Sequence, residues 1–196
     1  MNRTAAEWEQ LWAPYDQATY DLALRCIAPQ DIILEIGAGD LRLACQAARI
    51  ARRVYAVEIN LAILERGART FAPLPDNLEI IHADAKTLDI PNGVTLGVLL
   101  MRHCTHFGLY AAALRQVGCR RLVTNARWRM GVEVIDFEQA PILYNKAQVG
   151  WYACQCGAVG FKDGPLDDWS IERDALTQEV CACPACKKPE LQGVDE

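Results

Sequence analysis

Short apolar runs alternate with amphipathic segments along most of the sequence, and this pattern constrains the fold more than any other feature. The apolar runs predict strands near residues 32–36, 53–59, 77–84, 95–101, 119–127 and 131–137. Apolar residues at helical spacing predict helices near residues 16–26, 41–51, 61–71 and 108–117. Strands that are joined through helices run parallel, and the helices cover both faces of the sheet. We therefore expect an α/β fold with a Rossmann-like, doubly wound and mostly parallel sheet.

The sequence changes character near Gly150, so we expect two domains. Residues 1–150 carry the strand–helix pattern, whereas residues 151–196 are rich in Cys, Gly, Asp and Pro. Of the 196 residues, 52% are hydrophobic, which suits one sizeable globular domain with a small appendage. The sequence has neither a secretory signal pattern nor an apolar run of the roughly 18 residues that a membrane span needs. A cytoplasmic location is therefore expected.

A Gly-x-Gly turn follows the first predicted strand and opens a helix. Gly37 and Gly39 allow the backbone to approach a ligand closely and to adopt unusual dihedral angles. Glu58 ends the next strand about twenty residues later, where a carboxylate can accept both hydroxyls of a ribose. The strand, the turn, the helix and the acidic residue together predict a nucleotide-binding site.

Three residues of this region indicate which nucleotide is bound. Arg42 replaces the third glycine of a dinucleotide turn, and Asp40 places a negative charge where a pyrophosphate would sit. Glu35, at the end of the strand, can instead meet a cationic ammonium group. S-adenosylmethionine carries an ammonium and a sulfonium, so the turn favours this cofactor over NAD.

Three stretches together resemble the cofactor half of class I S-adenosylmethionine-dependent methyltransferases. They are ILEIGAGDLRLA, RVYAVEIN and NLEIIHADAKTLDIP, and they are similar to motifs I to III of that class, particularly in the ribosomal RNA adenine dimethylase family. The resemblance covers about residues 30–125 and implies that residues 1–150 bind S-adenosylmethionine. The candidate cofactor-binding residues are Glu35, Gly37, Ala38, Gly39, Glu58, Ile59, Asp84, Ala85, Tyr15 and Tyr20.

The resemblance implies a role for most of these residues. Glu35 and the glycine turn would line the methionine end of the cofactor, and Glu58 would hold the ribose. Asp84, together with Ala85, would meet the adenine. The two tyrosines lie upstream of the motifs, where they can cover the cofactor or simply pack as helix residues.

The fourth predicted strand ends in MRHCTHF, where amino methyltransferases of this class have Asn or Asp, then Pro and an aromatic residue. Open α/β sheets hold their ligands at such strand ends, so Arg102, His103 and His106 are the candidate catalytic residues. A histidine can take a proton from an oxygen, nitrogen or thiol nucleophile, and Arg102 can orient an anionic acceptor. Either histidine can alternatively cap a helix or pack against the sheet. Further candidates for the rim of the pocket are Tyr110, Asn125 and Trp128.

Five of the nine cysteines cluster behind residue 150 in a Cys-x-Cys-Gly pair and a Cys-x-Cys-Pro-x-Cys run. Two such knuckles are typical of a zinc ribbon, and a structural Zn²⁺ would help so small a segment to fold. The predicted ligands are Cys154, Cys156, Cys183 and Cys186. Cys181 either replaces Cys183 or stays free. Redox chemistry at the Cys-Pro-x-Cys pair is the alternative.

The formal net charge of −5 disfavours non-specific nucleic-acid binding, which needs clustered basic residues. One stretch without acidic residues contains five arginines, which either are solvated or form an anion-binding edge: Arg115, Arg120, Arg121, Arg127 and Arg129. The acidic cysteine-rich segment favours a protein partner or a structural role over nucleic acid.

The sequence thus predicts an S-adenosylmethionine-dependent methyltransferase with an unidentified, possibly macromolecular, acceptor. One alternative is a nucleic-acid methyltransferase that acts on rRNA or tRNA. The other is a catalytically silent cofactor-binding or scaffold protein that acts through its zinc ribbon.

Overall fold

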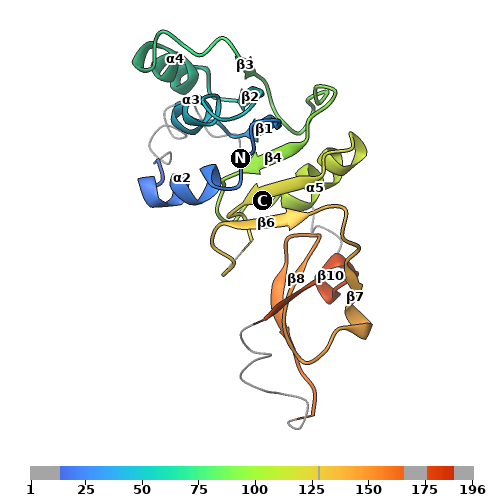
Figure 1. The fold of residues 1–196 in the computed structure, drawn as a ribbon. Coiled ribbons are helices and arrows are strands. Elements are labelled where there is room, and N and C mark those ends of the chain that lie inside the picture. Colours follow the sequence, from blue (N-terminus) through green and yellow to red (C-terminus); the bar gives the residue numbers. More distant parts are fainter. Residues whose placement is uncertain (1–13, 128, 166–175, 188–196) are drawn as a thin grey trace, which may run out of the picture.

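The computed structural model describes residues 14–127, 129–165 and 176–187, which form two β-sheets (Figure 1). The larger sheet has six strands in the order β3-β2-β1-β4-β5-β6. Its strands are β1 (Ile32–Ile36), β2 (Arg53–Glu58), β3 (Leu78–His82), β4 (Leu96–Leu99), β5 (Arg121–Thr124) and β6 (Glu133–Asp136). The first five run parallel and β6 runs antiparallel to β5, which confirms the predicted mostly parallel sheet. The strand order reverses between β1 and β4, and this switch point opens a crevice at the carboxyl ends of the strands.

Helices cover the two faces of this sheet unequally. The described α-helices are α2 (Gln17–Leu24), α3 (Arg42–Ala47), α4 (Leu61–Thr70) and α5 (Phe107–Gln116). Figure 1 shows α2, α3 and α4 on one side of the sheet and α5 on the other. Asp16 caps α2 by accepting the Thr19 N–H at 2.8 Å, and Asn60 caps α4 in the same way. These caps explain why the two helices begin where they do.

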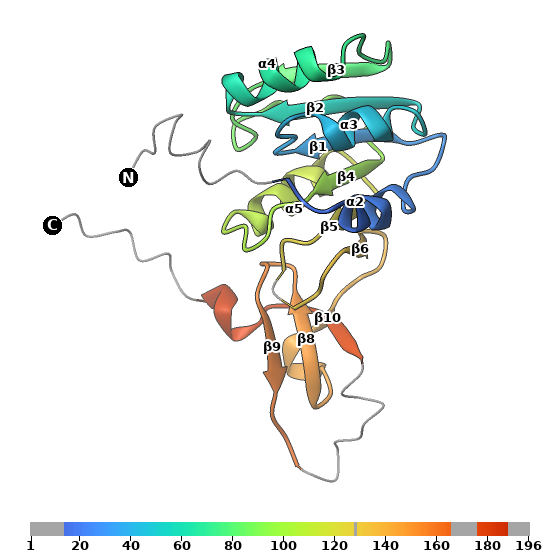
Figure 2. The same ribbon diagram turned by 90° about the vertical axis from the view of Figure 1, so that its left-hand side faces the viewer.

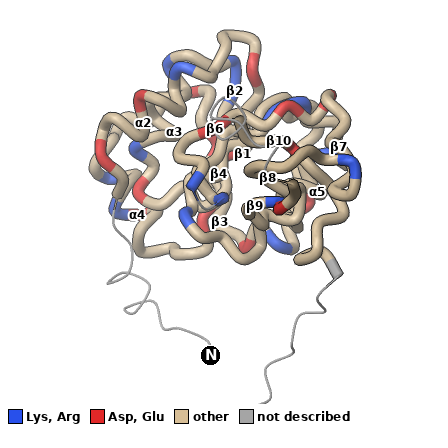
Figure 3. Tube along the Cα trace, turned by 90° about the horizontal axis from the view of Figure 1, so that it is seen from below, with Lys and Arg blue, Asp and Glu red and all other residues tan. Residues whose placement is uncertain are grey.

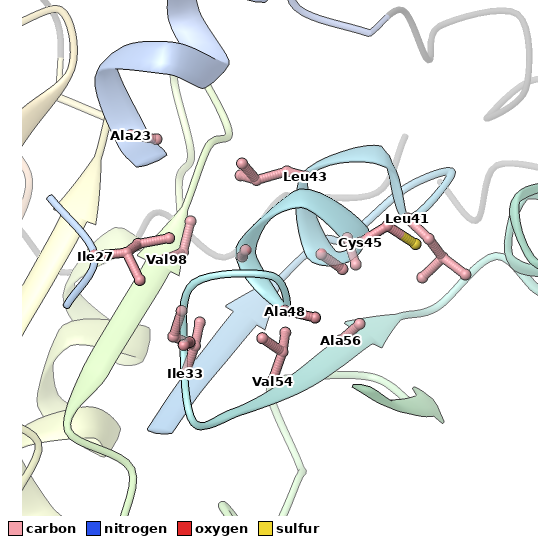
Figure 4. Close-up of a cluster of buried hydrophobic side chains, with 14 of the residues drawn as sticks. Ala23, Ile27, Ile33, Leu41, Leu43, Cys45, Ala48, Val54, Ala56 and Val98 are labelled. Carbon is pink, nitrogen blue, oxygen red and sulfur yellow. The ribbon is translucent and has the colours of Figure 1, made fainter. Parts of the chain in front are cut away.

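Two clusters of buried side chains hold the helices on the sheet. The first joins α2 and α3 to β1, β2 and β4, and Figure 4 shows Ala23, Leu43, Ile33, Val54 and Val98 within it. The second places Phe107 and Leu114 of α5 against the opposite face of β1 and β2. Apolar strands that are buried on both faces are what a parallel sheet requires.

The connection between β3 and β4, residues 83–95, contains no helix, and the sequence predicted none there. Pro91 and Gly93 lie in this connection, and both disfavour a helix interior. Leu88, Ile90 and Val94 nevertheless pack on the sheet beside α5. An irregular segment therefore covers the part of this face that α5 leaves open.

The smaller sheet has four strands in the order β7-β10-β8-β9 and lies beyond the β6 edge of the larger sheet (Figures 1 and 2). Its strands are β7 (Ile142–Leu143), β8 (Gly150–Cys154), β9 (Val159–Lys162) and β10 (Thr177–Cys181), with short 3-10 helices at Tyr144–Lys146 and Pro184–Lys187. This sheet already includes β7, which precedes the expected boundary at residue 150. Whether the two parts are separate domains stays a prediction.

Within the described residues, none of the helices combines the length and the apolar character that crossing a bilayer requires.

Candidate functional site

A cavity of about 430 Å³ opens at the switch point of the larger sheet. It receives residues from the carboxyl ends of β1, β2, β3 and β4 and from the segment that leads into α2. All ten candidate cofactor-binding residues line it, namely Tyr15, Tyr20, Glu35, Gly37, Ala38, Gly39, Glu58, Ile59, Asp84 and Ala85. Residues that are spread over seventy positions of the sequence therefore meet in one cavity.

The glycine turn brings the backbone of the first strand to the cavity wall. Gly37 has a φ of +76°, and its N–H and that of Ala38 both donate to the Val57 carbonyl at 2.9 Å. A Cβ on Gly37 would lie 2.8 Å from Cε of Met101. Gly39 has a φ of +56°. Both glycines are therefore needed for the turn itself, and Gly37 is also needed for the space it leaves.

The carboxylate of Glu58 is held in place by three backbone N–H groups. Its Oε2 accepts from Gly39 at 3.0 Å, and its Oε1 accepts from Ile59 and Asn60 at 2.9 Å each. An ionised carboxylate has about four acceptor positions, so capacity for a further donor remains. The side chain therefore ties the end of β2 to the glycine turn and can still bind a hydroxyl.

Glu35 is a buried acid at the inner wall of the cavity. Its side chain is 6% exposed, and its Oε2 has no hydrogen-bond partner. Burial, followed by the negative charges of Glu58 and Asp40, raises the pKa of Glu35 to about 8. An unpartnered buried carboxyl that lines a cavity is suited to receive a cationic donor from a ligand.

Asp40 does not present the free negative charge that the sequence suggested at the glycine turn. Its two carboxylate oxygens accept from Nε and Nη2 of Arg42, with a shortest distance of 2.6 Å. Arg42, at the first position of α3, therefore offsets the charge that was expected to repel a pyrophosphate. The preference for S-adenosylmethionine rests on Glu35 rather than on Asp40.

Asp84 lies two residues beyond the end of β3, and Lys86 contacts both of its carboxylate oxygens. Its Oδ1 accepts the Lys86 N–H at 2.9 Å, and Nζ of Lys86 lies 3.4 Å from its Oδ2. The Asp84 side chain is about one-third exposed. It can therefore accept a hydrogen bond from a ligand while its position is fixed by the turn that follows the strand.

Tyr15, Tyr20 and Arg102 form a connected wall of the cavity. The Tyr15 N–H donates to the Tyr20 hydroxyl, and the Arg102 N–H donates to the Tyr15 hydroxyl, both at 3.0 Å. The guanidinium of Arg102 lies 5.1 Å from the centre of the Tyr15 ring. The segment before α2 is thus attached to the end of β4, which places both tyrosines and Arg102 around one opening.

The structure separates the two candidate histidines. His106 occupies the N-cap position of α5 without a capping side-chain hydrogen bond and lines the cavity, with its ring centre 6.3 Å from that of Tyr110. His103 has a φ of +58° in the tight turn after β4 and is not among the residues that line the cavity, although both histidines are exposed. Tyr110 does line it, and burial raises the pKa of its phenol to about 12, so it stays a hydrogen-bond donor.

Two of the candidate rim residues are not placed at the cavity. Asn125, at the end of β5, is 5% exposed, and both polar atoms of its side chain lack a partner. It is not among the residues that line the cavity. Trp128 lies outside the described residues.

Four of the five arginines in the arginine stretch already contact carboxylates or aromatic rings, and Arg120 is exposed, so the anion-binding edge stays a prediction. Arg121 pairs with Asp31 at 2.8 Å, and Arg127 is buried between two glutamates. Arg129 and Arg115 lie over aromatic rings. Figure 3 shows acidic and basic residues intermingled along the chain. Asp31 and Glu179 are distant in the sequence from the arginines that they bind, so a local reading of charge does not reveal these pairs.

The four predicted metal ligands meet at one point between β8 and the end of β10. Their Sγ atoms all lie within 4.8 Å of one another: Cys154, Cys156, Cys183 and Cys186. Three of the six Sγ–Sγ separations are 3.5 to 3.7 Å, close to the roughly 3.8 Å that a tetrahedron with Zn–S bonds of about 2.3 Å requires. The cysteines form no disulfides, and Cys181 is not part of this group.

Some residues of the site escaped the sequence analysis. Gly67 of α4 packs so closely on the glycine turn that a Cβ would lie 2.3 Å from the Asp40 carbonyl oxygen. Met101 and Asn60 also line the cavity. A glycine inside an otherwise helical pattern was the available signal for Gly67, because it lowers helix propensity without a local benefit.

Comparisons with known proteins support the fold and the motifs. No protein-family model matches the chain. Over 65 residues it is 42% identical to the probable ribosomal RNA small subunit methyltransferase A of Methanosarcina acetivorans, a match that covers 33% of this chain and 24% of that protein. Over 75 residues it is 36% identical to an uncharacterised methyltransferase of Mycobacterium bovis, and this match covers 37% of this chain and 37% of that protein. The chain thus spans well under half the length of these relatives.

Two solved structures share the fold. The 23S rRNA methyltransferase ErmE superposes with a TM-score of 0.51 at 18% identity, covering 60% of this chain and 48% of that one. Precorrin 8W decarboxylase of Methanobacterium thermoautotrophicum superposes with a TM-score of 0.50 at 19% identity, covering 58% of this chain and 64% of that one. These structures confirm the Rossmann-like α/β fold, and the sequence matches agree with the resemblance of the three motifs to methyltransferases.

Proposed function

We propose that this chain is an S-adenosylmethionine-dependent methyltransferase that binds its acceptor beside Arg102 and His106. The observation that carries the proposal is the convergence of all ten candidate cofactor residues on one cavity at the switch point. The cavity has about the size that small-molecule and cofactor sites have. S-adenosylmethionine, when bound, supplies an electrophilic methyl group on a sulfonium.

The residues present fit this cofactor. Glu35 offers an unpartnered carboxyl oxygen to an ammonium group, and the glycine turn leaves room for close approach of a ligand. Glu58 would accept from ribose hydroxyls, and Asp84 would accept from the adenine amino group. Ile59 is exposed at the mouth of the cavity and can pack on an apolar ring face.

The acceptor side is built from the end of β4 and the start of α5. Arg102 would hold an anionic group of the acceptor, since Tyr15 orients its guanidinium at the opening. His106 would take the proton from the acceptor nucleophile, and Tyr110 would donate a hydrogen bond. Most of the rate enhancement would come from holding the nucleophile in line with the methyl group.

We infer further that Cys154, Cys156, Cys183 and Cys186 bind a structural Zn²⁺. The sulfur separations support this assignment, and four thiolates leave no open coordination position for chemistry. A cytoplasmic location and a protein partner of this segment stay predictions.

An RNA acceptor is the second candidate, favoured by the 42% local identity to a probable ribosomal RNA methyltransferase. Two observations weaken it: the fourth strand ends without the Asn or Asp, Pro and aromatic residues, and Arg121 and Arg127 are already paired with carboxylates. A catalytically silent cofactor-binding protein would show binding without methyl transfer.

Isothermal titration with S-adenosylhomocysteine tests the cofactor site. We expect saturable one-to-one binding, at least about tenfold weaker in Gly37→Val and in Glu58→Ala, because each change alters the turn or the ribose acceptor. Gly118→Ala serves as the control, since Gly118 also has a positive φ, of +78°, but has nothing within 4 Å of an added Cβ. Absence of binding by the wild type, or equal binding by all variants, would count against the proposal.

Labelled S-adenosylmethionine and fractionated lysate then identify the acceptor. Label in small molecules, protein or RNA distinguishes the acceptor classes, and at saturating S-adenosylmethionine transfer should fall in Arg102→Ala and in His106→Ala. Tight binding with no label transferred to any fraction would favour the silent protein.

A further inference from the structure

The first cysteine knuckle (residues 154–157) lies against the first turn of α5, and the second knuckle (residues 183–186) follows β10. A Cβ on Gly157 would lie 3.1 Å from Cδ1 and 3.3 Å from Cβ of Phe107, and Gly157 has a φ of +99°. From the other side, a Cβ on Gly108 would lie 3.4 Å from the backbone of Cys156. Two glycines thus allow the backbone that carries two of the four cysteines to touch the start of the helix (Figure 2).

The strand that leads to the second knuckle, β10, is tied to the start of α5 by Arg127. The guanidinium of Arg127 donates to both oxygens of Glu179 on β10, at 2.8 and 2.9 Å, and to Glu133 on β6. The Arg127 side chain is 2% exposed, and its guanidinium lies 5.7 Å from the centre of the Phe107 ring. Phe107 is therefore in contact with the first knuckle and close to the arginine that anchors the strand of the second.

The same turn of α5 carries side chains of the cavity. His106 immediately precedes Phe107, and Tyr110 follows one helical turn later; both line the cavity. Phe107 itself is 1% exposed and points into the core. A shift of this turn would move both cavity residues together, because packed cores transmit displacement rather than absorb it.

We propose that the four-cysteine cluster positions the first turn of α5 and thereby the acceptor side of the cavity, with Gly157 and Phe107 as the positioning residues. The proposal rests on the proposed function, since it takes the cavity that His106 and Tyr110 line to be the one that binds the cofactor. Metal binding fixes the knuckle turns, and the segment that contains them has a small core of five buried residues. Removing the metal loosens Gly157 and with it the support of Phe107.

Binding energies that are coupled in this way must be reciprocal. If zinc strengthens binding of S-adenosylhomocysteine by a given factor, saturating S-adenosylhomocysteine must strengthen zinc binding by the same factor. We expect a factor of about five or more, the lower end of typical coupling.

The full chain is titrated with S-adenosylhomocysteine in its zinc-loaded and zinc-depleted forms. Zinc affinity is measured by chelator competition with and without the same ligand. Gly157→Ala, checked for one zinc per chain, should reduce the coupling factor towards one, whereas Gly118→Ala should keep it. Gly118 lies just beyond the opposite end of α5, so Ala strains its backbone as it does at Gly157 but meets no neighbour. Equal affinities in the zinc-loaded and zinc-depleted wild type would overturn the proposal.

Two outcomes need a second measurement. If zinc-depleted chain unfolds, zinc-loaded Gly157→Ala must bind S-adenosylhomocysteine more weakly than zinc-loaded Gly118→Ala, and equal binding overturns the proposal.

If the wild type does not bind S-adenosylhomocysteine at all, the proposed function fails, but NMR still tests whether the zinc site positions α5. The chain has three histidines, so zinc removal should shift the ring signals of His106 and leave those of His82 in place. An unchanged His106 signal would overturn the positioning role.

Discussion

Glu35 offers the sharpest test of the site, because its burial predicts a dependence of stability on pH that no surface carboxyl would produce. Glu35→Gln keeps the size of the side chain and removes its titration. The pKa of Glu35 rises from an ordinary value of 4.5 to about 8, first because the carboxyl is buried and second because Glu58 and Asp40 are negative. The folded protein therefore holds a proton on Glu35 over a range in which the unfolded chain has lost it.

The direction and size of the effect follow from proton linkage. Below about pH 4.5 Glu35 is protonated in both the folded and the unfolded protein, and its contribution to stability is fully present. This contribution is lost as the pH rises to about 8, at about 1.4 kcal/mol per pH unit. The free energy of unfolding of the wild type therefore falls by roughly 5 kcal/mol relative to that of Glu35→Gln across the whole interval. Between pH 6 and pH 8 the expected loss is about 2–3 kcal/mol.

Urea unfolding of wild type and Glu35→Gln at several pH values between 6 and 9 measures this difference. We expect the free energy of unfolding of the variant to increase relative to that of the wild type up to about pH 8, and the difference to level off above this pH. A difference that stays constant over this range, or that changes in the opposite direction, would refute the assignment of Glu35 as a protonated buried acid. Affinity for S-adenosylhomocysteine should in parallel rise with pH in the wild type only, since an ammonium favours the ionised carboxylate.

Two further predictions concern packing and the metal site. Gly67→Ala should destabilise the protein by about 1–3 kcal/mol in thermal or urea unfolding, because the clash with the Asp40 carbonyl outweighs the gain of up to about 1 kcal/mol in helix propensity; an unchanged or raised stability would contradict the close packing. Metal analysis should give one zinc per chain for the wild type and for Cys181→Ser but none for Cys183→Ser; if both variants lost zinc, the four-ligand assignment would be wrong.

Much of the fold could be predicted because its signals are local. The strands β1 and β2, the glycine turn and the helix α4 follow from apolar periodicity and from caps within a few residues. The early start of the second sheet at β7 could not. It depends on the pairing of Ile142 with Val180 of β10, and a single window of sequence does not contain that information.

The two halves of the candidate site also differ in how far they can be predicted from local sequence. The cofactor half uses residues at the ends of consecutive strands, and parallel topology alone brings such ends to one edge. The acceptor half depends on tertiary contacts, since Tyr15 is 87 residues away from the Arg102 backbone that it binds. His103 and His106 were equivalent candidates in the sequence, and only the backbone turn after β4 distinguishes them.

In the proposed function, the acceptor half would also limit which acceptors can be methylated. A carboxamide or carboxylate followed by Pro and an aromatic residue suits a neutral, flat amine, because it accepts from the amino group and stacks on the ring. The end of β4 offers a guanidinium at Arg102 instead, and α5 offers an imidazole at His106. A guanidinium favours an anion, and an imidazole favours a nucleophile that must lose a proton. We therefore propose an acidic acceptor with an ionisable oxygen, nitrogen or thiol as the first candidate, ahead of an adenine base of ribosomal RNA.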